Sequence, residues 1–341
     1  MVITLVVTLI HGILNIHNLS GLAVLNQVSV FWSCAGLAVV MLVLSVAAEH
    51  RQFNWVFTDY ENKTGFDSPI YVFMLGMIGA AYSLFGCECA ASVNEETQDA
   101  DIASPWAMTM SIVTAWFVGL IFLISLLFSI QDMDAILNTE LHMPVAQLFQ
   151  DAVGLWAAIA FLILMVTCQF CTGATTVTVA SRQIYALARD NAAPMSPFLY
   201  ALNHQKIPAN AIWITTALTS MVVLPFPLSE HVFETIVSAA TVAIHLAYAL
   251  VLGCRLGVSI ERQGRFSLGR YSTPITWIGF LWATYAIFAF MLPTAWPIEA
   301  NNANYAGLGL FIVAGTTYCF WLGWGRFHYV GPTVMNDATD L

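Results

Sequence analysis

The stretch IYVFMLGMIGAAYSLFGCECAASVNEET (residues 70–97) runs from an apolar segment into a polar one. Its apolar part carries no charge, is interrupted by glycines, and is long enough to enter the core of a bilayer. A carboxylate, Glu88, then follows two residues after Gly86. Charged side chains within membrane spans are rare and costly, and they usually face a protein interior or a water-filled cavity. The stretch therefore predicts a membrane helix that breaks beside a polar site.

The composition extends this conclusion to the whole chain. Of 341 residues, 59% are hydrophobic and only 9% are charged, and the mean hydropathy is +0.76. So few charges do not cover the surface of a soluble protein of this length. We therefore expect an all-α polytopic membrane protein, embedded in a lipid bilayer. The net charge is −10, and no basic patch predicts a nucleic-acid partner.

The seven cysteines lie mostly within apolar runs, which argues against a disulfide framework. Cys87-x-Cys89 and Cys168-x-x-Cys171 have spacings seen in metal sites, but neither has a neighbouring His or a second pair. Buried cysteine is usually a small hydrophobic residue. We therefore predict no metal site and no cofactor.

Hydropathy predicts nine spans, each about 18–25 residues long, as crossing the hydrocarbon requires. Their predicted ranges are 1–18, 27–47, 69–91, 106–129, 150–174, 209–227, 233–254, 273–292 and 306–325. Ser104 is the expected N-cap of the fourth, with Pro105 at its first helical position. The sequence ARDNAAP (188–194) is expected to end a long helix that continues past the fifth span.

The basic residues predict the orientation of these spans. Eight of the ten Lys and Arg residues fall on one side, and only Arg51 and Lys63 fall on the other. The positive-inside rule then places the C-terminus in the cytoplasm and residue 1 outside. The loop with Arg51 faces outward and contains Asn62-Lys63-Thr64, a pattern for N-glycosylation. The plasma membrane is favoured as the location, with the vacuolar membrane as the alternative.

A break at Ser83–Gly86 would free backbone groups for a small polar solute, because helices in lipid break only where they line a cavity. Tyr82 and Phe85 are placed to close over a ligand or to stack on a cationic head. Glu88 could attract a cation or take up a proton. The alternative is that the glycines only allow close helix packing and that Glu88 reaches the cytoplasmic interface.

Other polar residues within spans are weaker candidates for a pocket: Gln169 in the fifth span, and His245 and Tyr248 on one face of the seventh. Such residues often serve only helix packing. The acidic link, residues 94–101, is expected to be a solvated loop. No Ser-His-Asp spacing, phosphate-binding loop or paired carboxylates predict an enzyme.

Three segments together carry a family resemblance. They are FGCECAASVNEETQDADIASPWAM (85–108), ASRQIYALARDNAAPMSPFL (180–199), and FSLGRYSTPITWIGFLWATY (266–285) with MLPTAWPIEANNANYA (291–306). Their order and spacing resemble the amino acid–polyamine–organocation (APC) superfamily, and most of all its amino acid/choline permeases, which include GABA and choline carriers. The resemblance covers residues 1 to 330.

The resemblance implies a fold of two inverted five-helix repeats followed by two further helices. The nine spans would then be family helices four to twelve, with the first three absent. Residues 1–47 would be the end of the first repeat, 69–254 the second repeat, 273–325 the two last helices, and 326–341 a cytoplasmic tail.

The resemblance also implies a site. The residues that match the unwound substrate-binding segment of the family are Ser83, Leu84, Phe85 and Gly86. Glu88 matches its acidic position and, with Tyr82, is expected to serve coupling or gating. The implied function is a secondary active transporter, a symporter of amino acids or small amino compounds such as GABA or choline, with protons as coupling ion. The alternative is a truncated, non-transporting remnant or an incomplete gene model.

Overall fold

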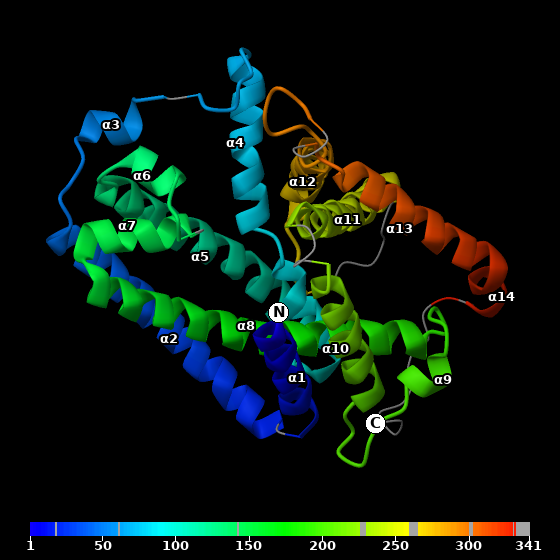
Figure 1. Ribbon diagram of the computed structural model, residues 1–341. Helices are drawn as coiled ribbons and strands as arrows, with labels where there is room; N and C mark the ends of the chain where they lie inside the picture. The colour runs from blue at the N-terminus through cyan, green and yellow to red at the C-terminus, as the bar shows by residue number, and fades with distance from the viewer. Residues whose placement is uncertain are drawn as a thin grey trace. The chain divides into compact units, whose positions relative to one another are not determined.

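The computed structural model describes residues 1–17, 19–60, 62–141, 143–225, 230–258, 265–299, 303–329 and 331. Most of the predicted tail, residues 330 and 332–341, lies outside this range. The described chain is helical and contains no strand, which confirms the all-α class (Figure 1). By length and composition, six of its segments can cross a bilayer: Gly21–Ala47, Pro69–Glu95, Ala100–Ser129, Leu155–Arg189, Val232–Gly257 and Ala306–His328.

Each predicted span overlaps a long helix. These helices are α1 (Val2–His17), α2 (Leu19–Ala47), α4 (Pro69–Ser83), α5 (Ala100–Ser129), α8 (Leu155–Arg189), α10 (Ala209–Val223), α11 (Glu230–Gly257), α12 (Ser272–Ala289) and α13 (Ala306–Phe320). The short elements are α3 (Phe53–Phe57), η1 (Cys87–Glu96), α6 (Met133–Leu137), α7 (Pro144–Val153), α9 (Ser196–Leu199), η2 (Gly269–Tyr271), η3 (Trp321–Gly325) and α14 (Arg326–His328).

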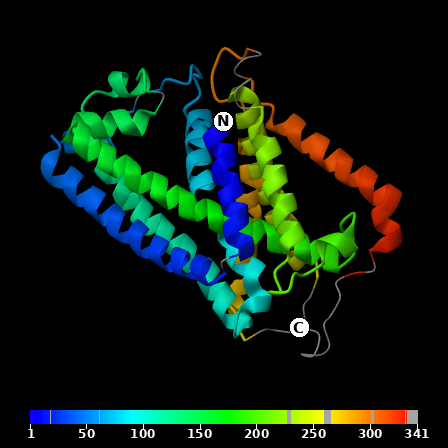
Figure 2. The same ribbon diagram turned by 60° about the horizontal axis from the view of Figure 1, so that its bottom comes forward.

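The chain forms two compact units that alternate along the sequence. The first unit comprises residues 1–6, 62–109 and 179–341, and the second comprises 7–61 and 110–178. In the first unit α11 packs against α10, α12 and α13, and α12 also packs against α4 (Figures 1 and 2).

Small side chains fill the centre of the first unit. Ala81, Val242, Ala286 and Ala306 are buried together with Phe290. Small residues let membrane helices approach closely, so van der Waals packing joins α4, α11, α12 and α13 here.

Two tyrosines fix α4 within the first unit. The Tyr285 hydroxyl of α12 donates to the carbonyl of Met74 at 2.6 Å, and Tyr71 of α4 donates to the carbonyl of Pro293 at 2.7 Å. These bonds hold α4 at both its start and its middle, and so they position the end of the helix, where the candidate site lies.

The second unit has a separate core and a buried polar centre. Leu44 of α2, Phe149 of α7 and Phe161 of α8 belong to one apolar cluster. The fully buried Asn15 of α1 donates to the carbonyls of His11 at 2.9 Å and Ala174 at 3.0 Å. Its amide is thereby satisfied inside the unit, as buried polar groups in membrane proteins require.

The predicted N-cap of the fourth helix is wrong. The helix α5 begins at Ala100, so Ser104 is not its N-cap and Pro105 lies inside it. Asp99 takes a positive φ of 49°, and its carbonyl accepts two amide hydrogen bonds from the first turn, both at 2.9 Å. The Ser104 hydroxyl instead donates to the carbonyl of Ala90 at 3.2 Å. The helix therefore starts at the backbone turn of Asp99. The Ser-Pro pattern at residues 104 and 105 pointed to a later start.

The fifth span begins later than predicted. Gly154, with a φ of 82°, separates α7 from α8, and α8 runs from Leu155 to Arg189. The prediction that this helix continues past residue 174 is confirmed, and it ends five residues before Pro194.

Candidate functional site at the break after α4

The break in the predicted stretch comprises residues Leu84 to Gly86. The helix α4 ends at Ser83, and the amide of Leu84 still donates to the carbonyl of Ala80 at 3.2 Å. Gly86 then adopts a left-handed conformation with a φ of 95° and a ψ of 6°, and η1 begins at Cys87. A Cβ atom at Gly86 would meet no described atom within 4 Å. Glycine is therefore required here by the backbone and not by crowding.

Tyr248 of α11 connects the two sides of this break. Its hydroxyl donates a hydrogen bond to Oε2 of Glu88 and accepts one from the amide of Gly86 at 3.4 Å. We call these three residues the Glu88–Tyr248 junction. Glu88 and Tyr248 are both partly buried, so the carboxylate has a fixed position beside the freed backbone. This is the arrangement expected for an ionisable group that faces a protein interior.

His245 lies one turn before Tyr248 and is 2% exposed. Its Nδ1 lies 2.9 Å from the carbonyl of Thr241, so Nδ1 carries a proton and donates there. The ring centroid lies 6.5 Å from that of Phe85 and 5.8 Å from that of Phe290. The rings of Phe85, His245 and Phe290 thus lie next to one another beside the break.

The remaining predicted residues are placed differently. Tyr82 is 49% exposed, and its ring lies 5.4 Å from Phe85. The Ser83 hydroxyl donates back to the carbonyl of Gly79 at 2.8 Å, so it bonds to its own helix. Leu84 is partly buried. Gln169 is exposed on α8 in the second compact unit.

Polar contacts with α8 and with the segment before α12 hold the chain that follows the junction. Gln183 of α8 donates to the Ser92 hydroxyl at 3.1 Å, and Arg189 at the end of α8 forms an ion pair with Glu95. The half of the broken helix that contains Glu88 is therefore tied to α8.

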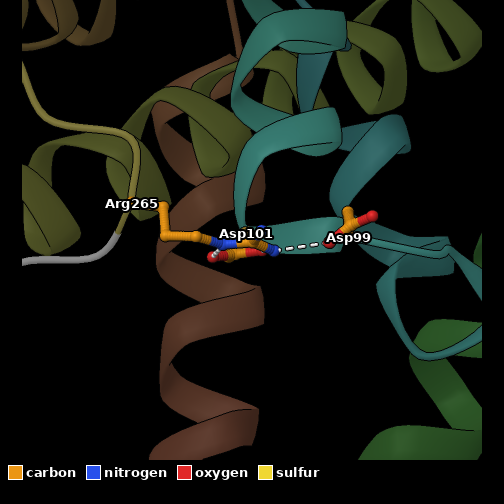
Figure 3. Close-up of polar contacts among 3 residues, drawn as sticks. All are labelled: Asp99, Asp101 and Arg265. Atoms are coloured by element: carbon orange, nitrogen blue, oxygen red, sulfur yellow. Dashed lines mark hydrogen bonds and ion pairs between the residues drawn. The ribbon is translucent and has the colours of Figure 1, made fainter.

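The acidic link is further tied by Arg265. The Arg265 guanidinium donates to Oδ1 of Asp99 and to Oδ2 of Asp101, each at 2.6 Å (Figure 3). The hydrogen bond to Asp101, and to a smaller extent the one to Asp99, raises the pKa of the Arg265 guanidinium further above its usual range. The expected solvated loop is thus exposed but also ion-paired, and water and salt screen the pairs.

The junction offers a carboxylate, a phenol, freed backbone groups and aromatic faces. This set can bind a cationic amine through the carboxylate and ring faces, and it can hold a proton on the carboxylate. Within the described ranges, no three His, Cys, Asp or Glu side chains gather in a way that could hold a metal ion.

Comparison with known proteins identifies the family. The sequence profile described as amino acid permease matches residues 1–314.

The chain belongs to the amino acid permease family.

Relatives within the amino acid permease family include amino-acid permease BAT1 of Arabidopsis thaliana, which is 30% identical over 95% of this chain. Its homologue in Oryza sativa subsp. japonica is 30% identical over 97% of the chain. The GABA-specific permease of Saccharomyces cerevisiae is 28% identical over 94%. The chain spans 65%, 66% and 58% of the lengths of these three proteins. The expected membership of the APC superfamily is confirmed, and the absence of three family helices stays a prediction.

The sequence of this permease singles out both Glu88 and Tyr248, but it does not predict the hydrogen bond between them. They are 160 residues apart, and the pairing needs α11 to lie beside the break. Each was singled out as a polar residue inside an apolar span, and Glu88 also by its match to the acidic position of the family, but neither signal indicates the partner. The ion pairs of Arg265 had no signal at all, since its partners belong to a link that was expected to be solvated.

Proposed function

We propose that the chain acts as a secondary active transporter of amino acids or related small amino compounds. The observation that carries this proposal is the Glu88–Tyr248 junction, a fixed carboxylate directly beside a helix break. Transporters of many folds bind substrate at interrupted helices, where half-helix ends and unwound backbone face a cavity. Family membership supports the same conclusion.

The proposed substrate is an amine such as an amino acid, GABA or choline. Its cationic group would lie against the faces of Phe85 and Tyr82, near the carboxylate of Glu88. Its polar remainder would bond to backbone groups of the break, which comprises residues Leu84 to Gly86. A GABA-specific permease among the relatives is consistent with this class of substrate.

The proposed coupling ion is the proton, and its proposed carrier is Glu88. When Glu88 is ionised it accepts the Tyr248 hydrogen bond, and when it takes up a proton this charge-assisted bond weakens. Protonation would thereby loosen the half-helix from α11 and favour a second orientation of the break. This links proton binding to alternating access. The proposal keeps residues 69–254 as one repeat of the inverted-repeat fold, the C-terminus in the cytoplasm, and the plasma membrane as the location.

Reconstitution tests the proposal. The full chain in proteoliposomes should take up labelled amino acid or GABA faster when an inward proton gradient is imposed, and Glu88→Gln should abolish this acceleration. The exposed Glu140 on the segment between α6 and α7 provides a matched control, and Glu140→Gln should behave as the unaltered chain. Absence of uptake by the folded, unaltered chain would contradict the transport proposal. Normal gradient-driven uptake by Glu88→Gln would contradict only the role of Glu88.

A further inference from the structure

The loop between α3 and α4 contains the sequence Asn62-Lys63-Thr64 in a fixed turn. Oδ1 of Asn62 accepts hydrogen bonds from the amide of Thr64 at 3.0 Å and from its hydroxyl at 2.7 Å. Asn62 and Lys63 are exposed. These two hydrogen bonds fix the orientation of the side-chain amide, whose nitrogen is the atom that would carry the sugar. The threonine required by the acceptor pattern thus contacts the asparagine that would be modified.

Contacts within the first unit hold this turn in place. The amide of Trp296 donates to the carbonyl of Thr64 at 2.8 Å. Gly65 has a φ of 79°, and a Cβ there would lie 2.5 Å from the carbonyl oxygen of Trp296. The Phe66 ring packs on Tyr71 with centroids 4.4 Å apart. The chain after Asn62 is therefore anchored, while Asn62 itself remains exposed.

The length of α4 places Asn62 outside the hydrocarbon. This step rests on the proposed function, and it takes the break to lie near the midplane of the bilayer, as binding sites at interrupted transporter helices do, with the loop facing outward. The 15 residues of α4 rise about 22 Å, whereas half of the hydrocarbon is about 15 Å thick. Pro69 then lies roughly 7 Å beyond the hydrocarbon boundary, and Asn62 precedes it by a further loop. With the predicted orientation, the acceptor would then lie on the outer, lumenal face, where the transferase acts.

The sequence holds a second acceptor pattern, Asn18-Leu19-Ser20. The orientation predicted from the basic residues places it on the cytoplasmic side, between the first two spans. Because lumenal enzymes reach only one side, the two patterns cannot both be modified. We propose that Asn62 carries an N-linked glycan and that Asn18 does not.

The proposed reaction needs a lipid-diphosphate-linked oligosaccharide as donor. A bond forms between Nδ2 of Asn62 and the first carbon of the sugar, and the bond from that carbon to the phosphate oxygen breaks. Nδ2 loses one proton to a base of the transferase, and the lipid diphosphate leaves. Nδ2 keeps its second proton, so it can still donate the hydrogen bond that it makes to the carbonyl of Phe66 at 2.6 Å in the unmodified side chain.

Digestion with peptide-N-glycosidase tests this proposal on the full chain expressed in a eukaryotic cell. We expect the enzyme to increase the gel mobility of the unaltered chain by one step. The step should disappear in Asn62→Gln and in Thr64→Ala, and it should remain in Thr64→Ser, which keeps the hydroxyl, and in Asn18→Gln.

Two results would overturn the proposal. The first is an unaltered chain that is insensitive to the enzyme. The second is a mobility step that Asn18→Gln removes, which would also reverse the orientation. Neither result depends on transport activity. Thr64→Ala lies outside the Glu88–Tyr248 junction and should retain uptake at the unaltered rate, so a failed glycan prediction is distinguishable from a failed transport proposal.

Discussion

Removing the Tyr248 hydroxyl should destabilise the first unit through Glu88. Tyr248→Phe deletes one donor to a carboxylate and one acceptor of the Gly86 amide. A hydrogen bond to a charged group contributes about 1.5–3 kcal/mol in soluble proteins. Side-chain hydrogen bonds between membrane helices average about 0.6 and reach about 1.7 kcal/mol. The Gly86 contact, at 3.4 Å, is long and adds little. We therefore expect a coupling free energy between Tyr248 and Glu88 of about 1–2 kcal/mol.

A double-mutant cycle measures this coupling. The free energy of unfolding is determined in mixed micelles for Tyr248→Phe, for Glu88→Ala and for the double variant. The matched control is Tyr285→Phe, which removes a tyrosine hydrogen bond to a neutral carbonyl, that of Met74. Its effect should add to that of Glu88→Ala within about 0.5 kcal/mol. A coupling free energy between Tyr248 and Glu88 no larger than that between Tyr285 and Glu88 would refute the proposed hydrogen bond of the junction.

Two further predictions concern glycines. Gly86→Ala should lower the unfolding free energy by about 1–2 kcal/mol, because only glycine adopts its left-handed conformation without strain. Gly79→Ala, seven residues earlier and inside α4, also places its Cβ in open space, and it should leave stability unchanged or raise it by up to about 1 kcal/mol. Equal effects of the two substitutions on the unfolding free energy would contradict the left-handed break at Gly86. In the second unit, Gly173→Ala should cost about 1–3 kcal/mol, since its Cβ would lie 2.5 Å from the buried ring of His11. Gly119→Ala in α5, whose Cβ meets no described atom within 4 Å, is its control, and thermal unfolding that ranks the two variants equally would contradict this packing.

Much of the fold was predictable because the bilayer imposes it. A helix that crosses hydrocarbon needs about 20 apolar residues and satisfies its own backbone, so hydropathy alone finds it. The break was also local, since Gly86 and the polar residues after it are adjacent in sequence. The start of α5 was missed because Pro105 is tolerated inside a helix whose first turn is fixed by Asp99.

The candidate site was predictable only as a set of residues. Local patterns single out Glu88 and Tyr248, but which helices lie side by side depends on the packing of alanines such as Ala81 and Ala286, which carry no pairing information. The ion pairs of Arg265 were not predictable for the same reason, because its partners are more than 160 residues away in the sequence. Tertiary contacts of this kind follow from the fold and not from the composition of a segment.

The central claim is that Glu88 couples proton movement to the movement of an amino compound. The most direct test measures labelled amino acid or GABA uptake and lumenal acidification together in proteoliposomes that contain the full chain. The account predicts that substrate addition acidifies the lumen with the unaltered chain and with Glu140→Gln, and that Glu88→Gln loses the acidification. Substrate-driven acidification that persists in Glu88→Gln would contradict the account.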